Sequence, residues 1–456
     1  MLFRSSNLQK SEDSFTSCEL SKIARETGFC RRSSKIDASV FFDLLMYDIS
    51  SGKSKSLNQL AIETKSEHEI DVSKQGIDKR FNEQTLSFLK VLIEKQLTLK
   101  LGNKLDAGWL SSFNRVIIKD GTRFDLPKEY KNYLAGSGGS ASQAGACLQF
   151  EYDLKSGHIT DLRLTPANRP DVKDAVEVLD TVERNDLVIR DLGYYAFSSL
   201  INISTKGAFY ISRLGAKTSV YEINKKGPEK LDFKSLYYEM KQNNLSMVCK
   251  DVLIGAEAKI PVRLVIELMP EAVYEQRMRK IHKYNQRMGY KTSEEYKFMS
   301  RFNLFITNVP LAVLPDQVIS SLYRIRWQIE LIYKIWKSVI GIHHTRKMKY
   351  KRWLCLLHFK LLLMIINWNL IMIQRNHFYK KKGRLLSLNK CFKTLFDNSH
   401  RLRKALRQGL KGIAKFINWA KNILNENHWL EKKNKSLGLE KIMYLFYCKS
   451  NIYVYI

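Results

Sequence analysis

The sequence lacks the cysteine spacing of several protein classes. Its seven cysteines are scattered and form no C-x-x-C pair; they are Cys18, Cys30, Cys147, Cys249, Cys355, Cys391 and Cys448. This spacing argues against a disulfide framework and against a zinc site. It is typical of the reduced thiols of a cytosolic protein.

Long apolar runs are also missing. The first 15 residues, MLFRSSNLQKSEDSF, contain no apolar stretch fit for a signal peptide. The best membrane candidate, LLLMIINWNLIMI at residues 361–373, is shorter than the ~20 residues that a span needs, and it contains Asn367 and Asn369. We therefore expect this segment to be a buried helix, and the protein to be cytoplasmic without a membrane partner.

Negative charge is scarce. The chain holds 45 Asp and Glu against 76 Lys and Arg, a formal net charge of +31. Such an excess predicts a polyanion partner, most commonly nucleic acid, with an anionic membrane as the competing interpretation. From residue 346 onward, about 25 Lys and Arg accompany only four acids. The 456 residues, 45% of them hydrophobic, predict a real core divided among two to four domains.

Apolar residues recur at helical spacing in the first 105 residues. Ser56 predicts the N-cap of a helix over 57–65, and Ser73 that of a second helix over 74–82. The exposed side of the second helix would present Lys74, Gln75, Lys79 and Arg80. A basic second helix indicates a helix-turn-helix that contacts DNA. The long acidic turn between the helices is equally consistent with two helices of an ordinary bundle.

Strand patterns begin near residue 115. The run RVIIKD ends in Asp120 and predicts a buried strand that leads into a loop at Gly121. Residues 146–166 predict two strands around a Lys-Ser-Gly turn, and a helix follows Arg169. The run DLVIRD predicts a further strand ending in Asp191.

A short helix at 197–203 and a strand at 207–214 complete this series. The order is that of an α/β ribonuclease H-like core, a mixed sheet in which three antiparallel strands are followed by parallel ones. Residues 215–300 interrupt it with strand-like segments and a basic helix at 271–289, which carries Arg277, Arg279, Lys280, Lys283 and Arg287. RFNLFITNVP then returns as a strand.

These patterns predict four regions. Residues 1–105 form a helical DNA-binding domain, and residues 106–214 together with 301–375 form the ribonuclease H-like domain. Residues 215–300 form a mostly β insertion domain, and residues 376–456 form a basic helical C-terminal region.

The segment YRIRWQIELIYKIWKSVIG, from residue 323, predicts an amphipathic helix. At about 100° per residue, Tyr323, Arg326, Glu330 and Lys337 fall within roughly 60° of one another. Ile325, Ile329, Ile332, Trp336 and Val339 repeat at the spacing of a core-facing stripe. The simplest interpretation of these four polar residues is a solvent-exposed helix face with ordinary ion pairs.

Three carboxylates far apart in the sequence favour a different interpretation. If the two strands that end in Asp120 and Asp191 are neighbours, their carboxylates lie side by side, and Glu330 would come from the amphipathic helix. Two aspartates and a glutamate of this kind bind two Mg²⁺ ions about 3.5–4 Å apart and support in-line attack at phosphorus. Taken singly, each aspartate could instead cap a turn.

The set DGT at 120–122, DLGYY at 191–195 and Y-(2)-R-(3)-E-(6)-K from Tyr323 resembles the DDE transposases of the insertion-sequence 4 family. All four positions of the last pattern match with the same gaps. The resemblance covers roughly residues 110–375. It implies a prokaryotic transposase that is associated with the nucleoid. Its DNA partners would be double-stranded terminal inverted repeats and double-stranded target DNA.

The resemblance implies roles for single residues. Asp120, Asp191 and Glu330 would be the catalytic, metal-binding triad, with Mg²⁺ as the cofactor and Mn²⁺ as a substitute. Tyr323, Arg326 and Lys337 would hold phosphates of the transposon end. It also implies cleavage by water, strand transfer by the released 3′-hydroxyl, and a homodimer in a synaptic complex.

Basic side chains outside the signature are further candidates for DNA contact, and the insertion domain lacks one residue that the family pattern contains. We expect Arg277, Lys280, Lys74, Lys79 and Arg80 to contact DNA, although a solvated helix face is the usual meaning of such basic runs. Members that form hairpins stack a flipped base on a tryptophan of the insertion domain. No tryptophan lies between Trp109 and Trp327 in this chain, so a tyrosine would have to replace it: Tyr210, Tyr221, Tyr237 or Tyr238.

Two alternatives to an active transposase remain at this point. One is a catalytically inactive, transposase-derived DNA-binding protein. The other is a ribonuclease H-like nuclease that cuts DNA without joining it.

Overall fold

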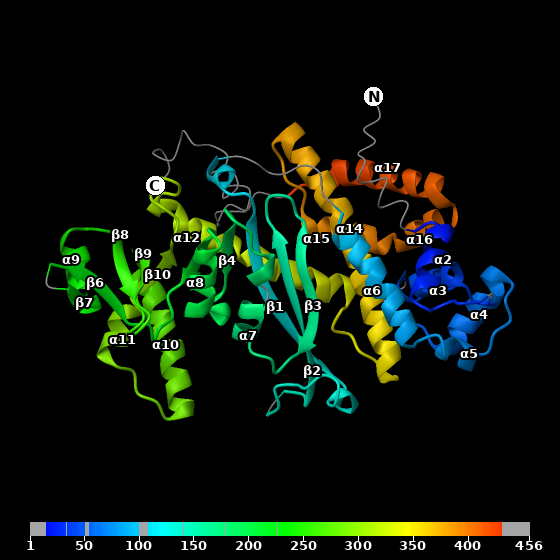
Figure 1. Ribbon diagram of the computed structural model, residues 1–456, viewed down its shortest axis with the longest axis horizontal. Coiled ribbons are helices and arrows are strands. Elements are labelled where there is room, and N and C mark those ends of the chain that lie inside the picture. Colours follow the sequence, from blue (N-terminus) through cyan, green and yellow to red (C-terminus); the bar gives the residue numbers. More distant parts are fainter. Residues whose placement is uncertain are drawn as a thin grey trace. The chain divides into compact units, whose positions relative to one another are not determined.

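The computed structural model describes residues 15–32, 34–50, 54–99, 108–139, 141–177, 179–225 and 227–430. Cys448 and the end of the basic tail lie outside these residues. The chain is mixed α/β and divides into two compact units (Figure 1). The first unit takes its described residues from 15–99, 121–168 and 328–430, and the second from 108–120 and 169–327.

The N-terminal part of the first unit is helical, as predicted. Its helices are α2 (Ser17–Glu26), α3 (Ala38–Ser50), α4 (Leu57–His68), α5 (Lys74–Asp78) and α6 (Glu83–Leu97). Ser56 caps α4 in a reciprocal capping box with Gln59, and Ser73 accepts a hydrogen bond from the amide of Gly76 at the start of α5. Both predicted N-caps are therefore confirmed.

The predicted second helix is shorter than expected. It was expected over 74–82, but α5 ends at Asp78. Phe81 turns into the core and packs against Phe41, with ring centroids 5.5 Å apart. Asn82 then accepts a hydrogen bond from the amide of Thr85 and starts α6. The cap and the apolar side chain end the helix early.

The first unit also contains the predicted hairpin. Strands β2 (Ala144–Asp153) and β3 (Ile159–Pro166) are antiparallel. The turn between them is buried beneath α14 (Tyr350–Lys382), where the Trp368 indole donates a hydrogen bond to the carbonyl of Gly157 at 2.7 Å. A helix that satisfies buried turn carbonyls belongs to the core.

Helix α14 contains the apolar segment at 361–373 that was the best membrane candidate. It is long and apolar enough to cross a membrane, but 78% of its most apolar window is buried inside the protein. Phe359 of α14 meets Phe42 of α3 edge-on at 5.0 Å. The prediction of a buried helix is confirmed. The basic tail continues as α15 (Leu388–Asp397), α16 (Ser399–Arg407) and α17 (Gly409–Asn427).

The second unit contains the predicted parallel strands. β1 (Val116–Leu126), β4 (Leu187–Arg190) and β5 (Phe209–Arg213) pair in parallel, in the order β1-β4-β5. Their β-branched and aromatic residues suit a sheet buried on both faces. The expected loop at Gly121 is wrong, because β1 continues through this residue to Leu126. β4 ends at Arg190, beside the middle of β1.

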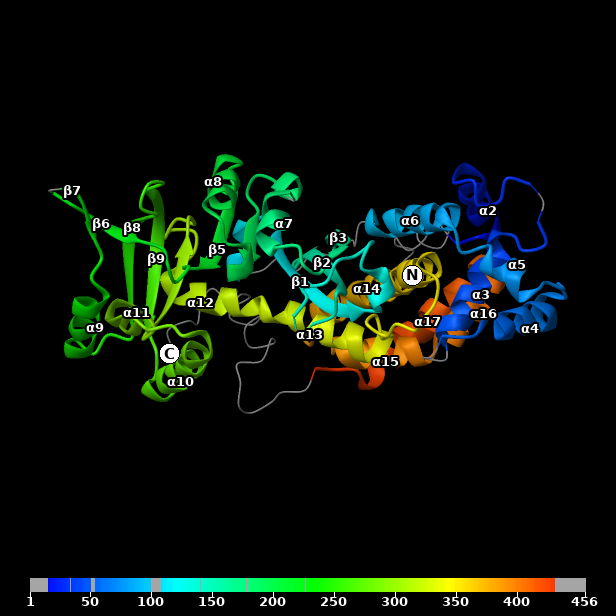
Figure 2. The ribbon, with the colours of Figure 1, turned by 90° about the horizontal axis from the view of Figure 1, so that it is seen from below.

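Helices cover both faces of these strands. α7 (Asp171–Glu177) and α8 (Phe197–Thr205) lie on one side of β5, and α12 (Asp316–Ile325) lies on the other (Figure 2). The predicted helices after Arg169 and at 197–203 are thus present.

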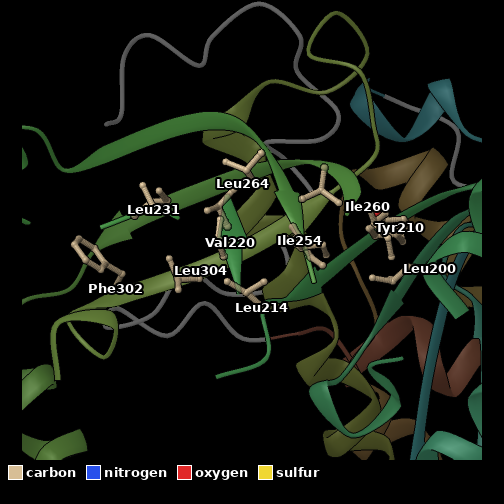
Figure 3. Close-up of a cluster of buried hydrophobic side chains, with 14 of the residues drawn as sticks. Leu200, Tyr210, Leu214, Val220, Leu231, Ile254, Ile260, Leu264, Phe302 and Leu304 are labelled. Atoms are coloured by element: carbon tan, nitrogen blue, oxygen red, sulfur yellow. The ribbon is translucent and has the colours of Figure 1, made fainter. Parts of the chain in front are cut away.

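The strands of residues 215–307 continue the sheet of the second unit. β10 (Phe302–Thr307) pairs with β5 on one side and β9 (Ile260–Leu268) on the other, and the order goes on through β8 (Met247–Ile254) and β6 (Val220–Asn224) to β7 (Gly227–Lys230). Side chains of these strands and of α8 form one apolar core (Figure 3). The remaining helices are α9 (Phe233–Gln242), α10 (Glu271–Met288) and α11 (Glu294–Met299).

Candidate active site

Two aspartates stand at the point where β4 ends beside β1. In the parallel ladder, Lys119 of β1 is the register partner of Arg190 of β4. The next residue along each chain segment is the candidate aspartate, Asp120 or Asp191. Asp191 keeps an extended backbone, with φ −75° and ψ 166°. The two carboxylates therefore project to the same face of the sheet.

Tyr323 of helix α12 and Arg326, the residue that caps the C-terminus of this helix, meet these carboxylates. The Tyr323 hydroxyl donates a hydrogen bond to Asp191 Oδ1 at 3.1 Å. The Arg326 guanidinium lies 3.3 Å from Asp120 Oδ2 through one terminal nitrogen and 3.8 Å from Asp191 Oδ1 through Nε. One guanidinium thus faces both carboxylates. The sequence places Tyr323 and Arg326 on one helical flank but does not predict these contacts with the two carboxylates. Their role as phosphate ligands stays a prediction.

Burial and charge differ among these groups. The side chains of Asp120 and Arg326 are 18% and 11% exposed, whereas that of Asp191 is 42% exposed. Burial, together with the nearby charge of Asp191, holds the pKa of the Tyr323 phenol well above its ordinary value. The phenol therefore stays protonated and remains a hydrogen-bond donor at neutral pH.

Glycine at position 121 has a steric reason. A Cβ placed there would meet the side-chain amide of Gln149 at 3.0 Å and Cys147 Sγ at 3.1 Å. Gln149 and Cys147 lie on β2 and are buried, so neither has room to move away. A side chain after the first aspartate would therefore crowd the buried side chains of Gln149 and Cys147, which favours glycine at this position.

Glu330 and Lys337 belong to the first unit. Glu330 lies in the first turn of α13 (Trp327–Ile335) and is half-buried. Lys337 lies in the π-helical turn that follows, Trp336–Ile340, and its amine donates to the carbonyl of Arg123 at 3.1 Å. Burial lowers the pKa of this amine. The single regular helix expected over 323–341 is wrong in two places: it is interrupted at Arg326, between α12 and α13, and the π-helical turn shifts the helical phase at its C-terminal end.

The expected DNA contacts divide into exposed and internal side chains. Lys74, Lys79 and Lys280 are exposed. The Arg277 guanidinium instead donates to the carbonyls of Ser300 and Phe302 and ties α10 to β10. The guanidinium of Arg80 packs over the Phe29 ring and bonds to the Ser34 hydroxyl. The expectation that Arg80 lies on the exposed side of its helix is wrong, because that ring and hydroxyl draw it inward.

The tyrosines considered for base stacking also differ in accessibility. Tyr210 is in the core with 2% exposure. A cation already covers the ring of Tyr221 (Lys259) and that of Tyr237 (Arg301). Tyr238 is 56% exposed. The buried position of Tyr210 removes it from that group, since stacking needs an accessible ring face.

The donor set suits a hard cation. Asp120 and Asp191 offer carboxylate oxygens, the ligands that Mg²⁺ prefers, and a cationic group of the protein already lies against both. Over the described parts of the chain, no group of three or more His, Cys, Asp or Glu side chains is gathered at metal-binding distance. The two aspartates of the second unit therefore fit one part of a carboxylate site.

Three buried residues next to these aspartates were not identified from the sequence. Lys119 and Arg190 each precede an aspartate, and Asp174 of α7 forms an ion pair with Lys119 at 2.9 Å between the Lys119 amine and Asp174 Oδ2. Arg190 donates to the carbonyl of Ala175. A signal was present, because VIIKD and LVIRD each place a cation between the end of an apolar run and the aspartate.

The comparison with known proteins agrees with this geometry. A family model described as the transposase DDE domain matches residues 111–368, which is more than half of the chain. The chain belongs to the DDE transposases, and the predicted membership of the insertion-sequence 4 family is confirmed. A domain of this family implies divalent-metal chemistry in general.

Individual relatives are transposases of named elements. The chain is 29% identical over 434 residues to the transposase for insertion sequence element IS231B of Bacillus thuringiensis subsp. berliner, and 30% identical over 434 residues to that for IS231E of subsp. finitimus; each match covers 91% of this chain and 90% of the relative. It is 27% identical to the transposase for IS1151 of Clostridium perfringens, over 89% of each chain.

Proposed function

We propose that this transposase binds the terminal inverted repeats of an insertion sequence and catalyses Mg²⁺-dependent DNA cleavage and strand transfer with Asp120, Asp191 and Glu330. The observation that carries the proposal is the convergence of Asp120 and Asp191 on Arg326, with Tyr323 hydrogen-bonded to Asp191. Three chain segments distant in sequence supply these groups.

The carboxylates would hold the metal. Asp120, Asp191 and Glu330 would bind Mg²⁺, or Mn²⁺ in its place. When bound, such ions lower the pKa of an attacking water or 3′-hydroxyl and stabilise the leaving oxygen. The Tyr323 hydroxyl restricts the rotation of the Asp191 carboxylate, which leaves the other oxygen of that group oriented for a ligand.

Arg326 has a second role in this proposal. Its contacts of 3.3 and 3.8 Å are longer than the ~2.7–2.9 Å of a tight charge-assisted hydrogen bond. The fork of donors suits phosphate oxygens, and Lys337 would act as a point charge.

The strand order supports a ribonuclease H-like catalytic domain. In the sheet order β3-β2-β1-β4-β5, the antiparallel β2–β3 hairpin lies at one edge and the parallel strands β1, β4 and β5 follow it. We assign this domain to residues 106–214 and 301–375, with a helical DNA-binding domain over 1–105, an insertion over 215–300 and a basic helical region from 376.

The proposed partners are the terminal repeats and the target DNA, with two protein copies in a synaptic complex. The exposed Lys74, Lys79 and Lys280 support backbone contacts to DNA. Arg277 and Arg80 are left out of this surface because their guanidinium groups bind inside the protein. A prokaryotic, nucleoid-associated location accompanies this function.

A cleavage and joining assay tests the function. Purified protein is incubated with Mg²⁺ and a supercoiled plasmid that carries the element's ends, and both nicking and joining of 3′-hydroxyl ends are measured. We expect both activities, and we expect Asp120→Asn and Glu330→Ala to abolish cleavage while leaving end binding intact.

Other results would point elsewhere. Cleavage without joining would identify a nuclease, and binding without cleavage would identify an inactive DNA-binding protein. Cleavage retained by Glu330→Ala would remove Glu330 from the triad.

A further inference from the structure

Helix α7 is attached to both strands that carry the candidate aspartates. Lys119 and Arg190 are register partners, so their side chains share one face of the sheet. Asp120 and Asp191 follow them and occupy the opposite face, where α12 supplies Tyr323 and Arg326. Figure 2 shows α7 and α12 on opposite sides of the sheet.

The attachment is ionic and fully buried. The Lys119 amine and the Asp174 carboxylate are 2.9 Å apart, and both side chains are 0% exposed. From the neighbouring strand, the Arg190 guanidinium donates to the carbonyl of Ala175, the residue after Asp174, at 3.1 Å. Two adjacent residues of one helix thus bind two adjacent strands.

The same helix also meets the turn after Asp191. A Cβ at Gly193 would lie 3.3 Å from Asp171 Oδ2. The first turn of α7 therefore packs against the backbone that immediately follows Asp191, while its middle binds the residue before Asp120. Movement of α7 would change the positions of both aspartates together.

We propose that Lys119 and Asp174 are positioning residues that fix the spacing of the Asp120 and Asp191 carboxylates for divalent-metal binding. The inference rests on the proposed function, which gives these carboxylates to the metal. Buried ion pairs are expensive to desolvate and add little net stability compared with apolar side chains. A pair placed directly behind both carboxylates is therefore explained better by geometry than by stability.

A second ion pair on the same two strands provides a matched control. Arg115 precedes β1 and Asp186 precedes β4, and their side chains are joined at 2.5 Å at the opposite ends of the strands. The Asp186 side chain is also 0% exposed. Replacing this pair changes the same kind of contact far along the strands from Asp120 and Asp191.

The experiment measures Mn²⁺ binding to the full chain by calorimetry, together with the melting temperature. The variants are Lys119→Met/Asp174→Asn, the control Arg115→Met/Asp186→Asn, and Asp120→Asn as the reference for the metal site. We expect the first double variant to bind Mn²⁺ at least about tenfold more weakly, because loss of groups that orient metal ligands typically costs 10–100-fold in affinity. The control double variant should bind Mn²⁺ as the unaltered protein does.

Two outcomes overturn the inference. One is unchanged Mn²⁺ affinity in Lys119→Met/Asp174→Asn, and the other is an equal loss in both double variants, which would make the pair only structural. Should the first double variant fail to fold, Arg190→Met decides, since it keeps the Lys119–Asp174 pair and removes the hydrogen bond from β4 to the Ala175 carbonyl of α7; unchanged affinity there also overturns the inference.

The Asp120→Asn reference separates the two proposals. We expect it to abolish Mn²⁺ binding. Undiminished Mn²⁺ binding by Asp120→Asn would refute the proposed metal site itself. Its loss, combined with normal binding by the Lys119→Met/Asp174→Asn variant, would refute only the positioning role.

Discussion

A single phenol hydroxyl restrains the more exposed of the two aspartates. Tyr323→Phe removes the hydrogen bond to Asp191 but keeps the ring, which packs against Phe305 at 5.3 Å. A hydrogen bond to a charged group contributes about 1.5–3 kcal/mol. We expect Mg²⁺-dependent end cleavage to slow by roughly 10–100-fold, measured as an initial rate, with little change in melting temperature.

The control for Tyr323→Phe is Tyr130→Phe. It removes another phenol hydroxyl, which donates to the carbonyl of Met348. That substitution should change stability more than cleavage. Equal cleavage rates for Tyr323→Phe and the unaltered protein would show that the hydrogen bond has no part in the reaction.

Asp48 makes stability depend on pH. It is 2% exposed, and burial raises its pKa to about 6, although the amide of Lys55 donates to its Oδ1 at 2.5 Å. Between about pH 4 and pH 6 the folded state binds more protons at this carboxyl than the unfolded state does, so its contribution to stability falls as pH rises through this window.

Asp48→Asn should therefore stabilise the protein at pH 7.5 by up to about 3 kcal/mol. At pH 4.5 the gain should be small, because the carboxyl is already mostly neutral in the folded state. Denaturant unfolding at the two pH values measures the difference. A gain of equal size at both pH values would contradict the assignment of the pKa to burial.

Helix α10 combines one internal cation with exposed ones. Arg277→Met should lower the melting temperature by several degrees, because it leaves the carbonyls of Ser300 and Phe302 without these donors. Lys280→Met, one turn along the same helix, should leave the melting temperature unchanged and weaken DNA binding. The reverse pattern would mean that Arg277 faces the DNA and Lys280 does not.

Most elements could be predicted from the sequence because their signals are local. Ser56 and Ser73 mark N-caps, and the β2–β3 hairpin follows from alternation around a turn. The continuation of β1 beyond Gly121 and the early end of α5 at Asp78 depend on tertiary contacts, the pairing of β1 with β2 and the packing of Phe81, which no local pattern contains.

Site residues could be predicted where polar side chains recur at a spacing that one local element explains. Tyr323 and Arg326 could be singled out because their spacing matches the signature of the DDE transposases, and the phosphate-binding role that this resemblance implies stays a prediction. The pairing of Lys119 with Asp174 could not, because it joins a strand to a helix through a contact 55 positions apart in the chain. The inward turn of Arg277 was equally hidden, since an exposed and a buried arginine have the same sequence signature.

For the molecule as a whole, the charge of +31 predicts salt-dependent DNA binding. If six or more phosphates are contacted, affinity for end DNA should fall on the order of 10³-fold between 50 and 200 mM salt. Fluorescence anisotropy with a labelled end measures it. The affinity of Asp120→Asn for end DNA should depend on salt concentration in the same way. An affinity that does not change with salt would show that phosphate contacts do not contribute to binding.

The position of β10 between β5 and β9 bears on how such a chain can diversify. Because β10 already pairs with the backbone of β5, the strands beyond β10 do not affect the pairing of β4 with β1. Related proteins could therefore gain or lose strands at the β7 edge of the sheet without a change at Asp120 and Asp191. Losing β10 would instead uncover β5 and invite association between chains through its bare backbone.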